Sequence, residues 1–275
     1  MADLRTTPVR HVVLDLDGTV YKGDQVFPET RPFLATLDEL RIGYTFLTNN
    51  TSRGTSDYVD KLAAMGIEVD ASKILTPVPA TMNHLREQGW RTLFVLGTTA
   101  LCAEFVAAGF VVFSESDAAK PDAVVVGFDT GLTYTGLCRA AWWISQDLPF
   151  VATHPDFVCP TDESTVLVDC GSICAALTAA TGRPPDATFG KPDPSMVRFV
   201  SIKSEVAVAE IAVVGDRLYT DIAMANRAGA LSVLVLTGET TDEQVKELDA
   251  GSDQVPDVIC SSLATFETQL RSWQA

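Results

Sequence analysis

Apolar runs and amphipathic stretches alternate along the whole chain. Runs rich in β-branched residues predict strands, and stretches with apolar residues three and four positions apart predict helices. Because the predicted strands are continuously apolar rather than alternating, we expect an α/β fold whose parallel sheets are covered on both faces. The predicted strands are His11–Leu16, Tyr44–Thr48, Thr92–Leu96, Ala123–Gly127, Phe150–Ala152, Ile211–Gly215, Leu231–Leu236 and Val258–Cys260. The predicted helices are Pro32–Arg41, Thr55–Met65, Leu218–Ala228 and Asp242–Leu248.

Polar residues follow some of these strands at their carboxyl ends, which is where parallel sheets bind ligands. The segments concerned are DLDGT at 15–19, TNNTS at 48–52 and GDRLYTD at 215–221. The strands in the middle of the chain have less polar ends. This asymmetry predicts a core built from residues 1–79 and 184–275, with residues 80–183 inserted as a second domain.

Asp15 and Asp17 are expected on the same side of the first strand end, because side chains alternate along a strand. Two close carboxylates repel each other unless a cation neutralises them or one is protonated. A hard cation such as Mg²⁺ would satisfy both. Alternatively, Asp15 is a nucleophile and Asp17 a general acid and base. Taken alone, DLDG is equally compatible with two solvated acids at a surface strand end.

The other strand ends also allow two interpretations each. Asp216 could cap the helix predicted to begin near Leu218, but beside Asp15 it is interpreted as a metal ligand. The Thr48 hydroxyl and the Asn49 amide come before a predicted helix, whose first N–H groups could bind an oxyanion. An ordinary capping turn is the alternative for this segment.

Two further motifs offer basic side chains. Lys191 stands between Gly190 and Pro192, and a lysine held in this way can place its charge on a phosphoryl oxygen. A solvated surface lysine is the alternative. His154 follows the strand predicted at Phe150–Ala152, where it would either touch a substrate or be structural.

Composition and charge exclude some partners. The chain has 275 residues, 47% of them hydrophobic, and its net charge is −16. The charge argues against nucleic acid and anionic membranes, because both are bound through basic patches. No apolar run reaches the roughly 20 residues of a membrane span. The first residues, MADLRTTPVRH, show no secretion signal, and the six cysteines are scattered, so we expect reduced thiols in a cytoplasmic protein.

Four motifs together resemble those of the haloacid dehalogenase superfamily in order and spacing. They are DLDGT at 15–19, TNN at 48–50, GKPD at 190–193 and GDRLYTDI at 215–222. TNNTSR followed by a long insertion before GKPD is similar to the NagD-like, p-nitrophenylphosphatase subfamily, in which an α/β cap domain is inserted between the second and third motifs. The resemblance implies a Rossmann-like core and a Mg²⁺-dependent phosphatase that acts on a small phosphorylated metabolite. Caps in the family sometimes mediate dimers, so it also allows a homodimer.

The resemblance further implies a role for each acidic motif residue. Asp15 would be the nucleophile that accepts the phosphoryl group. Asp17 would protonate the leaving alcohol and then activate water. Asp15, the backbone carbonyl of Asp17 and Asp216 would hold the metal, and Asp221 would order the metal's surroundings.

The remaining motif residues would bind substrate. By the same resemblance, Thr48, Asn49 and Lys191 would hold the phosphoryl oxygens, while His154 and Asp156 of the cap would face the leaving group. Relatives often have Asn where this chain has His154, which bears on the choice of substrate rather than on the reaction. The cap segment DCGSIC at 169–174 matches no particular substrate.

Other functions are compatible with the same core. A phosphosugar mutase would need a cap after the first motif, and the distance from Asp15 to Thr48 leaves little room for one. A catalytically silent phospho-ligand-binding protein would not need the complete set of catalytic side chains. A phospho-receiver domain is shorter and has no role for Asp17. We therefore predict hydrolysis of a small phosphomonoester through an aspartyl-phosphate.

Overall fold

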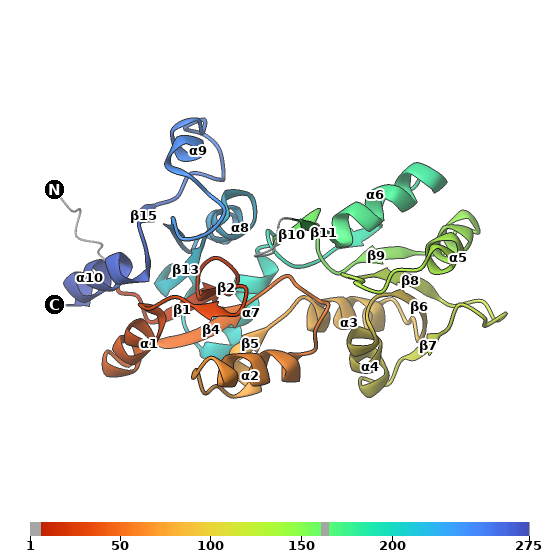
Figure 1. Cartoon of the computed structure of the whole chain (residues 1–275), viewed down its shortest axis with the longest axis horizontal. Helices are drawn as coiled ribbons and strands as arrows, with labels where there is room; N and C mark the ends of the chain where they lie inside the picture. The colour runs from red at the N-terminus through yellow and green to blue at the C-terminus, as the bar shows by residue number, and fades with distance from the viewer. Residues whose placement is uncertain (1–6, 161–164, 275) are drawn as a thin grey trace. The chain divides into compact units, whose positions relative to one another are not determined.

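The computed structural model describes residues 7–160 and 165–274, and these form two compact units, each with its own parallel sheet (Figure 1). The core unit comprises the chain up to Thr48, Val59–Leu75 and Lys191 onward. The insert unit comprises Asn49–Tyr58 and Thr76–Gly190. The insert therefore extends beyond the predicted cap at both ends, and it includes a short segment directly after Thr48.

The core unit contains a six-stranded sheet in the order β15-β14-β13-β1-β4-β5, with all neighbours parallel. The strands are β1 (His11–Asp15), β4 (Gly43–Leu47), β5 (Ile74–Leu75), β13 (Ile211–Gly215), β14 (Leu231–Val235) and β15 (Val258–Cys260). The strand order changes direction between β1 and β13. Open α/β sheets bind ligands beside the carboxyl ends of the strands at such a switch point.

Helices and short turns complete the core unit. They are α1 (Thr30–Glu39), most of α2 (Thr55–Ala64), α7 (Ser195–Ser204), α8 (Ala223–Ala228), α9 (Asp242–Lys246), α10 (Leu263–Gln274), and the turns η1 (Ala71–Lys73), η2 (Val208–Glu210) and η3 (Leu218–Ile222). A small antiparallel hairpin, β2 (Tyr21–Lys22) with β3 (Gln25–Val26), follows β1. Helices α1 and α10 pack together, with the rings of Phe33 and Phe266 at 5.7 Å between centroids.

The insert unit contains a five-stranded parallel sheet in the order β12-β9-β8-β6-β7. Its strands are β6 (Thr92–Leu96), β7 (Val111–Phe113), β8 (Ala123–Val126), β9 (Phe150–Ala152) and β12 (Ala187–Thr188). Its helices are α3 (Val78–Glu87), α4 (Thr99–Ala107), α5 (Tyr134–Ser145) and α6 (Cys170–Thr181). An antiparallel ribbon, β10 (Val158–Pro160) with β11 (Val166–Val168), lies between β9 and α6 in the chain.

Both faces of the insert sheet are buried, which explains why its strands are continuously apolar. Phe94 and Leu96 of β6 pack with Trp143 of α5 and Leu177 of α6 on one face. The alternate residues of β6 pack on the other face with side chains of α3 and α4, among them Phe105. A strand between two helical layers needs apolar residues at every position.

The α/β fold predicted from the sequence is confirmed. The strands predicted at 92–96, 150–152, 211–215 and 258–260 have the same bounds in the structure, and the other predicted strands differ by one residue at one end or, for the strand predicted at Tyr44–Thr48, at both ends. The helix predicted at Leu218–Ala228 begins instead with the π-helical turn η3, and α8 follows from Ala223. Within the described ranges 7–160 and 165–274, no helix is long and apolar enough to cross a membrane.

Candidate active site

Asp15 is the last residue of β1 and lies at the switch point of the core sheet. It is 7% exposed, and one of its carboxylate oxygens accepts a hydrogen bond from the Lys191 ammonium group. The same ammonium donates to Asp221 at 2.8 Å. Lys191 is itself buried, so the interpretation as a solvated surface lysine is wrong. A buried ammonium therefore pairs with two buried carboxylates from different parts of the chain.

Asp216 follows β13, the strand that neighbours β1 in the sheet. Its Oδ2 accepts a hydrogen bond at 2.7 Å from the backbone N–H of Glu239, in the loop after β14. Gly238 allows this close approach, because a Cβ atom there would lie 1.9 Å from Oδ2 of Asp216. The N-cap of η3 is Arg217, so the alternative that Asp216 caps this helix is wrong.

Asp221 is positioned by the π-helical turn η3. Its backbone N–H donates to the carbonyl of Arg217 at 3.1 Å, and its Oδ2 accepts from the N–H of Arg217 at 3.2 Å. Single π-helical turns occur frequently at functional sites. Here the turn directs the Asp221 carboxylate to the ammonium of Lys191.

Asp15, Asp216 and Asp221 could together hold a metal ion, since one oxygen from each lies within 4.8 Å of the others. Three carboxylates and one ammonium leave a net charge of 1 − 3 = −2 when all are ionised, which a divalent cation would balance. Oδ1 of Asp216 is buried and has no hydrogen-bond partner among the described residues. Carboxylate oxygens are the ligands that Mg²⁺ prefers, so the donor set fits this ion.

The pKa values in this cluster follow from burial and charge. Burial raises the pKa of Asp216 to about 6, and the charge of Asp221 adds to the increase. Burial also raises the pKa of Asp15 well above its usual range, although Lys191 opposes the shift. Burial alone would lower the pKa of Lys191, but the charges of Asp15 and Asp221 outweigh it and raise that pKa. Asp15 and Asp216 therefore need a positive partner in addition to Lys191 to be ionised together.

Asp17 has different surroundings from Asp15, although only Leu16 separates them. Its Oδ2 accepts a hydrogen bond from the Tyr21 hydroxyl at 3.4 Å, and its carboxylate is not part of the three-acid metal set. Burial raises the pKa of Asp17, with Lys61 and Arg217 opposing the shift. A carboxyl group with a raised pKa is suited to giving and taking protons.

The segment after β4 is a loop rather than the start of a helix. Thr48 and Asn49 are both buried, but α2 begins only at Thr55. Thr48 and Asn49 therefore do not lie in the first turn of α2, and the binding of an oxyanion by this segment stays a prediction. Instead, Oδ1 of Asn50 accepts from the N–H of Ser52 at 2.9 Å, which closes a local turn.

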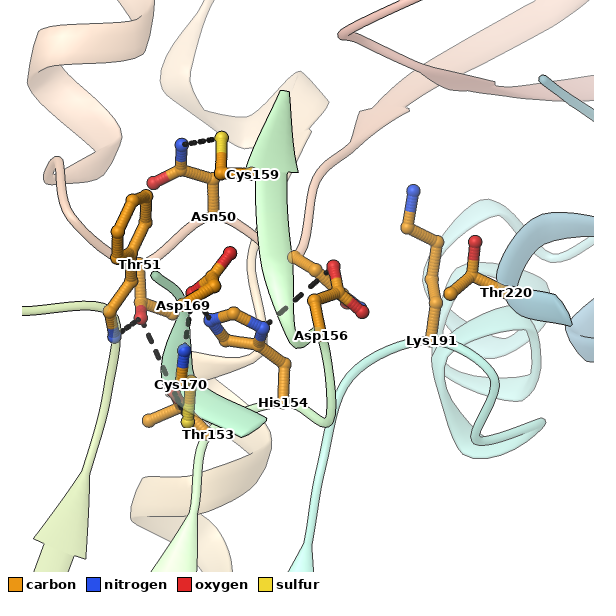
Figure 2. A network of polar contacts seen from close by, with 12 residues as sticks. Asn50, Thr51, Thr153, His154, Asp156, Cys159, Asp169, Cys170, Lys191 and Thr220 are labelled. Atoms are coloured by element: carbon orange, nitrogen blue, oxygen red, sulfur yellow. Dashed lines mark hydrogen bonds and ion pairs between the residues drawn. The ribbon is translucent and has the colours of Figure 1, made fainter. Parts of the chain in front are cut away.

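A second buried cluster lies within the insert unit (Figure 2). The ring of His154 lies between the carboxylates of Asp156 and Asp169, with Nδ1 at 3.8 Å from Asp156 and Nε2 at 3.4 Å from Asp169. Oδ1 of Asp156 accepts a hydrogen bond from the side-chain amide of Asn49 at 3.1 Å. The two residues predicted to face the leaving group are thus joined to one predicted to hold the phosphoryl group.

Sequence reasoning missed several residues that shape these clusters. Tyr21, Gly238 and Glu239 in the core unit had not been identified, nor had Asp169 and Gly171 in the insert unit as contributors to the site. The polar run GETT at 238–241 follows the predicted strand Leu231–Leu236, so the strand-end rule could have found Gly238 and Glu239. Asp169 and Gly171 act through contacts distant in sequence, which no local pattern indicates.

Family models and solved structures match this arrangement. The model described as haloacid dehalogenase-like hydrolase matches residues 12–111, and the model described as HAD-hydrolase-like matches residues 188–266. A 4-nitrophenylphosphatase from Thermotoga maritima is 40% identical, with a TM-score of 0.87 over 94% of this chain and 97% of that one. The chain belongs to the NagD-like subfamily of haloacid dehalogenase-like hydrolases. The resemblance of the four motifs to this family is thereby confirmed.

Two other relatives are similar over most of this NagD-like chain. Ribonucleotide monophosphatase NagD of Escherichia coli is 29% identical over 87% of this chain and 92% of that protein. Glycerol phosphate phosphatase of Mycobacterium tuberculosis, solved in complex with magnesium, is 32% identical, with a TM-score of 0.83 over 94% of this chain and 76% of that one. The chain is a phosphomonoester hydrolase of the family, as predicted.

Proposed function

We propose that the chain hydrolyses a small phosphomonoester in a Mg²⁺-dependent reaction, through an aspartyl-phosphate formed on Asp15. The observation that carries the proposal is the buried set of Asp15, Asp216, Asp221 and Lys191 at the switch point of the core sheet. Phosphoryl transfer depends mainly on positioning and on positive charge around the transferred group. This set offers a nucleophile, a fixed ammonium and the ligands for a divalent ion.

In the first half-reaction, a carboxylate oxygen of Asp15 attacks phosphorus and the bond to the leaving oxygen breaks. Asp17 transfers its proton to that oxygen, so the alcohol leaves as a neutral molecule. The raised pKa of Asp17, caused mainly by burial, supports its holding a proton at this stage. The hydrogen bond from Tyr21 keeps the side chain of Asp17 apart from the three-acid metal set.

In the second half-reaction, Asp17 takes a proton from a water molecule, whose oxygen attacks the aspartyl-phosphate. The bond between phosphorus and Asp15 breaks, which releases inorganic phosphate and restores both carboxyl groups. Asp17 thus gives a proton in one step and recovers one in the next, as microscopic reversibility requires of one group in both roles.

The other residues would bind the metal and orient the substrate. Asp15, the backbone carbonyl of Asp17 and Asp216 would hold the metal, with Asp221 beside them, and Mg²⁺ bound there would supply positive charge to the phosphoryl oxygens. Lys191 and the side chains of Thr48 and Asn49 would hold those oxygens. His154 and Asp156 would face the leaving group. All six cysteines are free, which fits a reducing compartment, so we place the enzyme in the cytoplasm.

The experiment is phosphate release from p-nitrophenyl phosphate and from a panel that includes nucleoside monophosphates and polyol phosphates. We expect turnover with Mg²⁺ and none with chelator. In Asp15→Asn, kcat should fall by at least about 10⁴-fold, because the nucleophile is removed. Asp253→Asn serves as a control, since this acid pairs with Arg227 on the surface.

Two results would contradict the proposal. One is a folded wild-type protein that binds phosphate esters without turning any of them over. The other is Asp15→Asn with wild-type activity. Rapid quenching of a reaction with ³²P-labelled substrate should trap labelled wild-type protein, and Asp15→Asn should carry no label.

A further inference from the structure

The first turn of α6 holds the loop that follows β9. The N–H of Gly171 donates to the carbonyl of Asp156 at 2.7 Å. The carbonyl of Phe157 accepts from the N–H of Asp169 at 3.0 Å and from the hydroxyl of Ser172 at 2.6 Å. These three hydrogen bonds fix the backbone at Asp156 and at the residue that follows it.

Gly171 is required for this contact. A Cβ atom at this position would lie 2.2 Å from the carbonyl oxygen of Pro155 and 2.9 Å from that of Asp156. Both are backbone atoms of the loop and have no side-chain freedom with which to move aside. The first turn of α6 and the loop therefore make a direct backbone contact that leaves no room for a Cβ atom at Gly171.

Asp169 supports the same loop through its side chain. It is 2% exposed, and its Oδ1 lies 3.4 Å from Nε2 of His154, which has no exposed surface. The other ring nitrogen of His154 faces Oδ2 of Asp156 at 3.8 Å, and Oδ1 of Asp156 accepts the amide of Asn49. Figure 2 shows the ring lying between the two carboxylates.

The segment that contains Asn49 is also held through Thr51, two residues further along the chain. The hydroxyl of Thr51 lies 3.2 Å from that of Thr153 at the end of β9, and it accepts the N–H of Phe128 after β8 at 3.0 Å. The backbone of the segment is thus fastened to the insert sheet. The direction of the Asn49 amide is then set by Asp156.

We propose that Asp169 is a positioning residue, which acts through His154 and Asp156 to orient the side-chain amide of Asn49. The inference rests on the proposed function, because it assigns Asn49 to the phosphoryl oxygens. Asn49 directly follows Thr48, the last core-unit residue before the insert unit. Asp169 thereby gains a role in a segment, DCGSIC, whose sequence matches no particular substrate.

A metal site at His154, Asp156 and Asp169 is the competing interpretation, since one ligand atom of each lies within 4.8 Å of the others. Metal ligands converge on one point at about 2.0–2.2 Å from the ion. Here the two carboxylates face different nitrogens of the same ring. This arrangement orients a side chain better than it surrounds an ion.

The test begins with two substitutions of Asp169. Asp169→Ala should lower kcat/KM for p-nitrophenyl phosphate by about tenfold to a hundredfold, because a small misplacement of a binding group is costly. The inhibition constant of inorganic phosphate should rise in parallel. Asp169→Asn keeps an oxygen acceptor at Oδ1 and should recover most of the loss.

Asp186→Ala is the matched control. Oδ2 of Asp186 accepts the N–H of Phe150 at 2.8 Å, at the beginning of β9 rather than at its end. This substitution removes a hydrogen bond to a strand of the same sheet, so it should lower the free energy of unfolding. It should leave kcat/KM and the inhibition constant of phosphate unchanged. An equal kinetic effect of the two alanine variants would overturn the positioning role.

A double-variant comparison tests whether Asp169 acts through Asn49. In an Asn49→Ala background, Asp169→Ala should change kcat/KM by less than about twofold, because residues in one network are not additive. If the fold-losses of kcat/KM in Asn49→Ala and Asp169→Ala multiply in the double variant, the inference is overturned. A single-variant loss that disappears in this background would support it.

A readout independent of turnover separates this inference from the proposed function. The side-chain amide signal of Asn49 in a ¹⁵N-labelled protein, assigned with Asn49→Ala, should shift in Asp169→Ala and stay in place in Asp186→Ala. If the wild type is inactive but this shift occurs, the proposed function fails and the positioning network stands. If the signal does not move, or if Zn²⁺ shifts the ring signals of His154 at stoichiometric concentration, the positioning role is overturned.

Discussion

The core unit and the insert unit each bury a cluster of acids beyond the carboxyl ends of a parallel sheet, but the clusters are built differently. In the core unit, oxygens of Asp15, Asp216 and Asp221 gather in one place, with the ammonium of Lys191 on two of them. In the insert unit, Asp156 and Asp169 lie against different nitrogens of one ring. One arrangement converges on a point and the other forms a chain.

The difference follows from where the acids come from. Asp15 and Asp216 end neighbouring strands at the switch point, and so the sheet itself brings their carboxylates together. Asp156 lies in a loop and Asp169 at a helix start. They come close only because the first turn of α6 is hydrogen-bonded to that loop. A convergent cluster suits an ion and a reaction, whereas a chain suits the transmission of orientation from one side chain to the next.

Asp216→Asn should have the largest effect of the changes that test this contrast. It removes one carboxylate from the convergent set, so kcat/KM should fall by roughly a thousandfold, in line with a few kcal/mol of lost charge stabilisation. Mg²⁺ at a hundredfold excess over Kd should stabilise the wild type by about 2.7 kcal/mol and stabilise this variant much less. Thermal unfolding with and without Mg²⁺ measures the second effect.

Asp169→Asn is the informative control, because it removes a carboxylate from the chain-like cluster instead. Its response to Mg²⁺ should equal that of the wild type. A loss of Mg²⁺ stabilisation in Asp169→Asn would show that the insert cluster also binds the ion, and the contrast between the clusters would then fail.

Gly171→Ala tests the backbone contact between α6 and the loop after β9, and its effect should be smaller than that of Asp216→Asn. A Cβ atom would meet backbone oxygens of Pro155 and Asp156, so we expect a loss of about 2–3 kcal/mol in the free energy of unfolding. Gly182→Ala at the other end of α6 is matched to it, because a Cβ atom there has no neighbour within 4 Å. Its cost should be about 1 kcal/mol, from the positive φ alone. Urea unfolding measures the loss in the free energy of unfolding for both variants. Equal losses would mean that the loop moves away from the added Cβ atom at no energetic cost.

The sequence predicted the convergent cluster better than the chain-like one. Strand ends are visible in sequence as apolar runs followed by polar residues, and one topological rule then brings Asp15 and Asp216 together. The pairing of Lys191 with Asp15 and Asp221 needed the resemblance, since a single lysine in a loop carries little information. The catalytic and binding roles assigned to these residues stay predictions.

Other features could not be predicted because tertiary contacts decide them. The short strands β5, β7 and β12 have two or three residues each, too few for a periodic pattern, and only sheet pairing defines them. The shape of the loop between Thr48 and Thr55 depends on contacts of Thr51 with Phe128 after β8 and with Thr153 after β9. The sequence gives no local sign of such contacts.

His11 provides the smallest test, as a buried histidine that has cations rather than carboxylates for neighbours. Its Nε2 lies 2.9 Å from the hydroxyl of Thr45. Burial lowers the pKa of His11 from its ordinary value near 6.5 to about 4, and the charges of Lys73 and Lys203 add to the decrease. This is the opposite environment to that of His154, which lies between two acids.

The sign of the pH effect follows from this lowered pKa. Between pH 6.5 and about 4 the unfolded chain binds a proton at His11 that the folded protein does not, so stability is present above pH 6.5 and is lost as the pH falls towards 4. The loss should be about 2 kcal/mol more in the wild type than in His11→Gln, which cannot titrate. Urea unfolding of both proteins at several pH values between 7 and 4 gives the difference. If the difference does not change with pH, then His11 takes up a proton in the folded protein as readily as in the unfolded chain, and burial beside two lysines does not by itself keep an imidazole neutral in this fold.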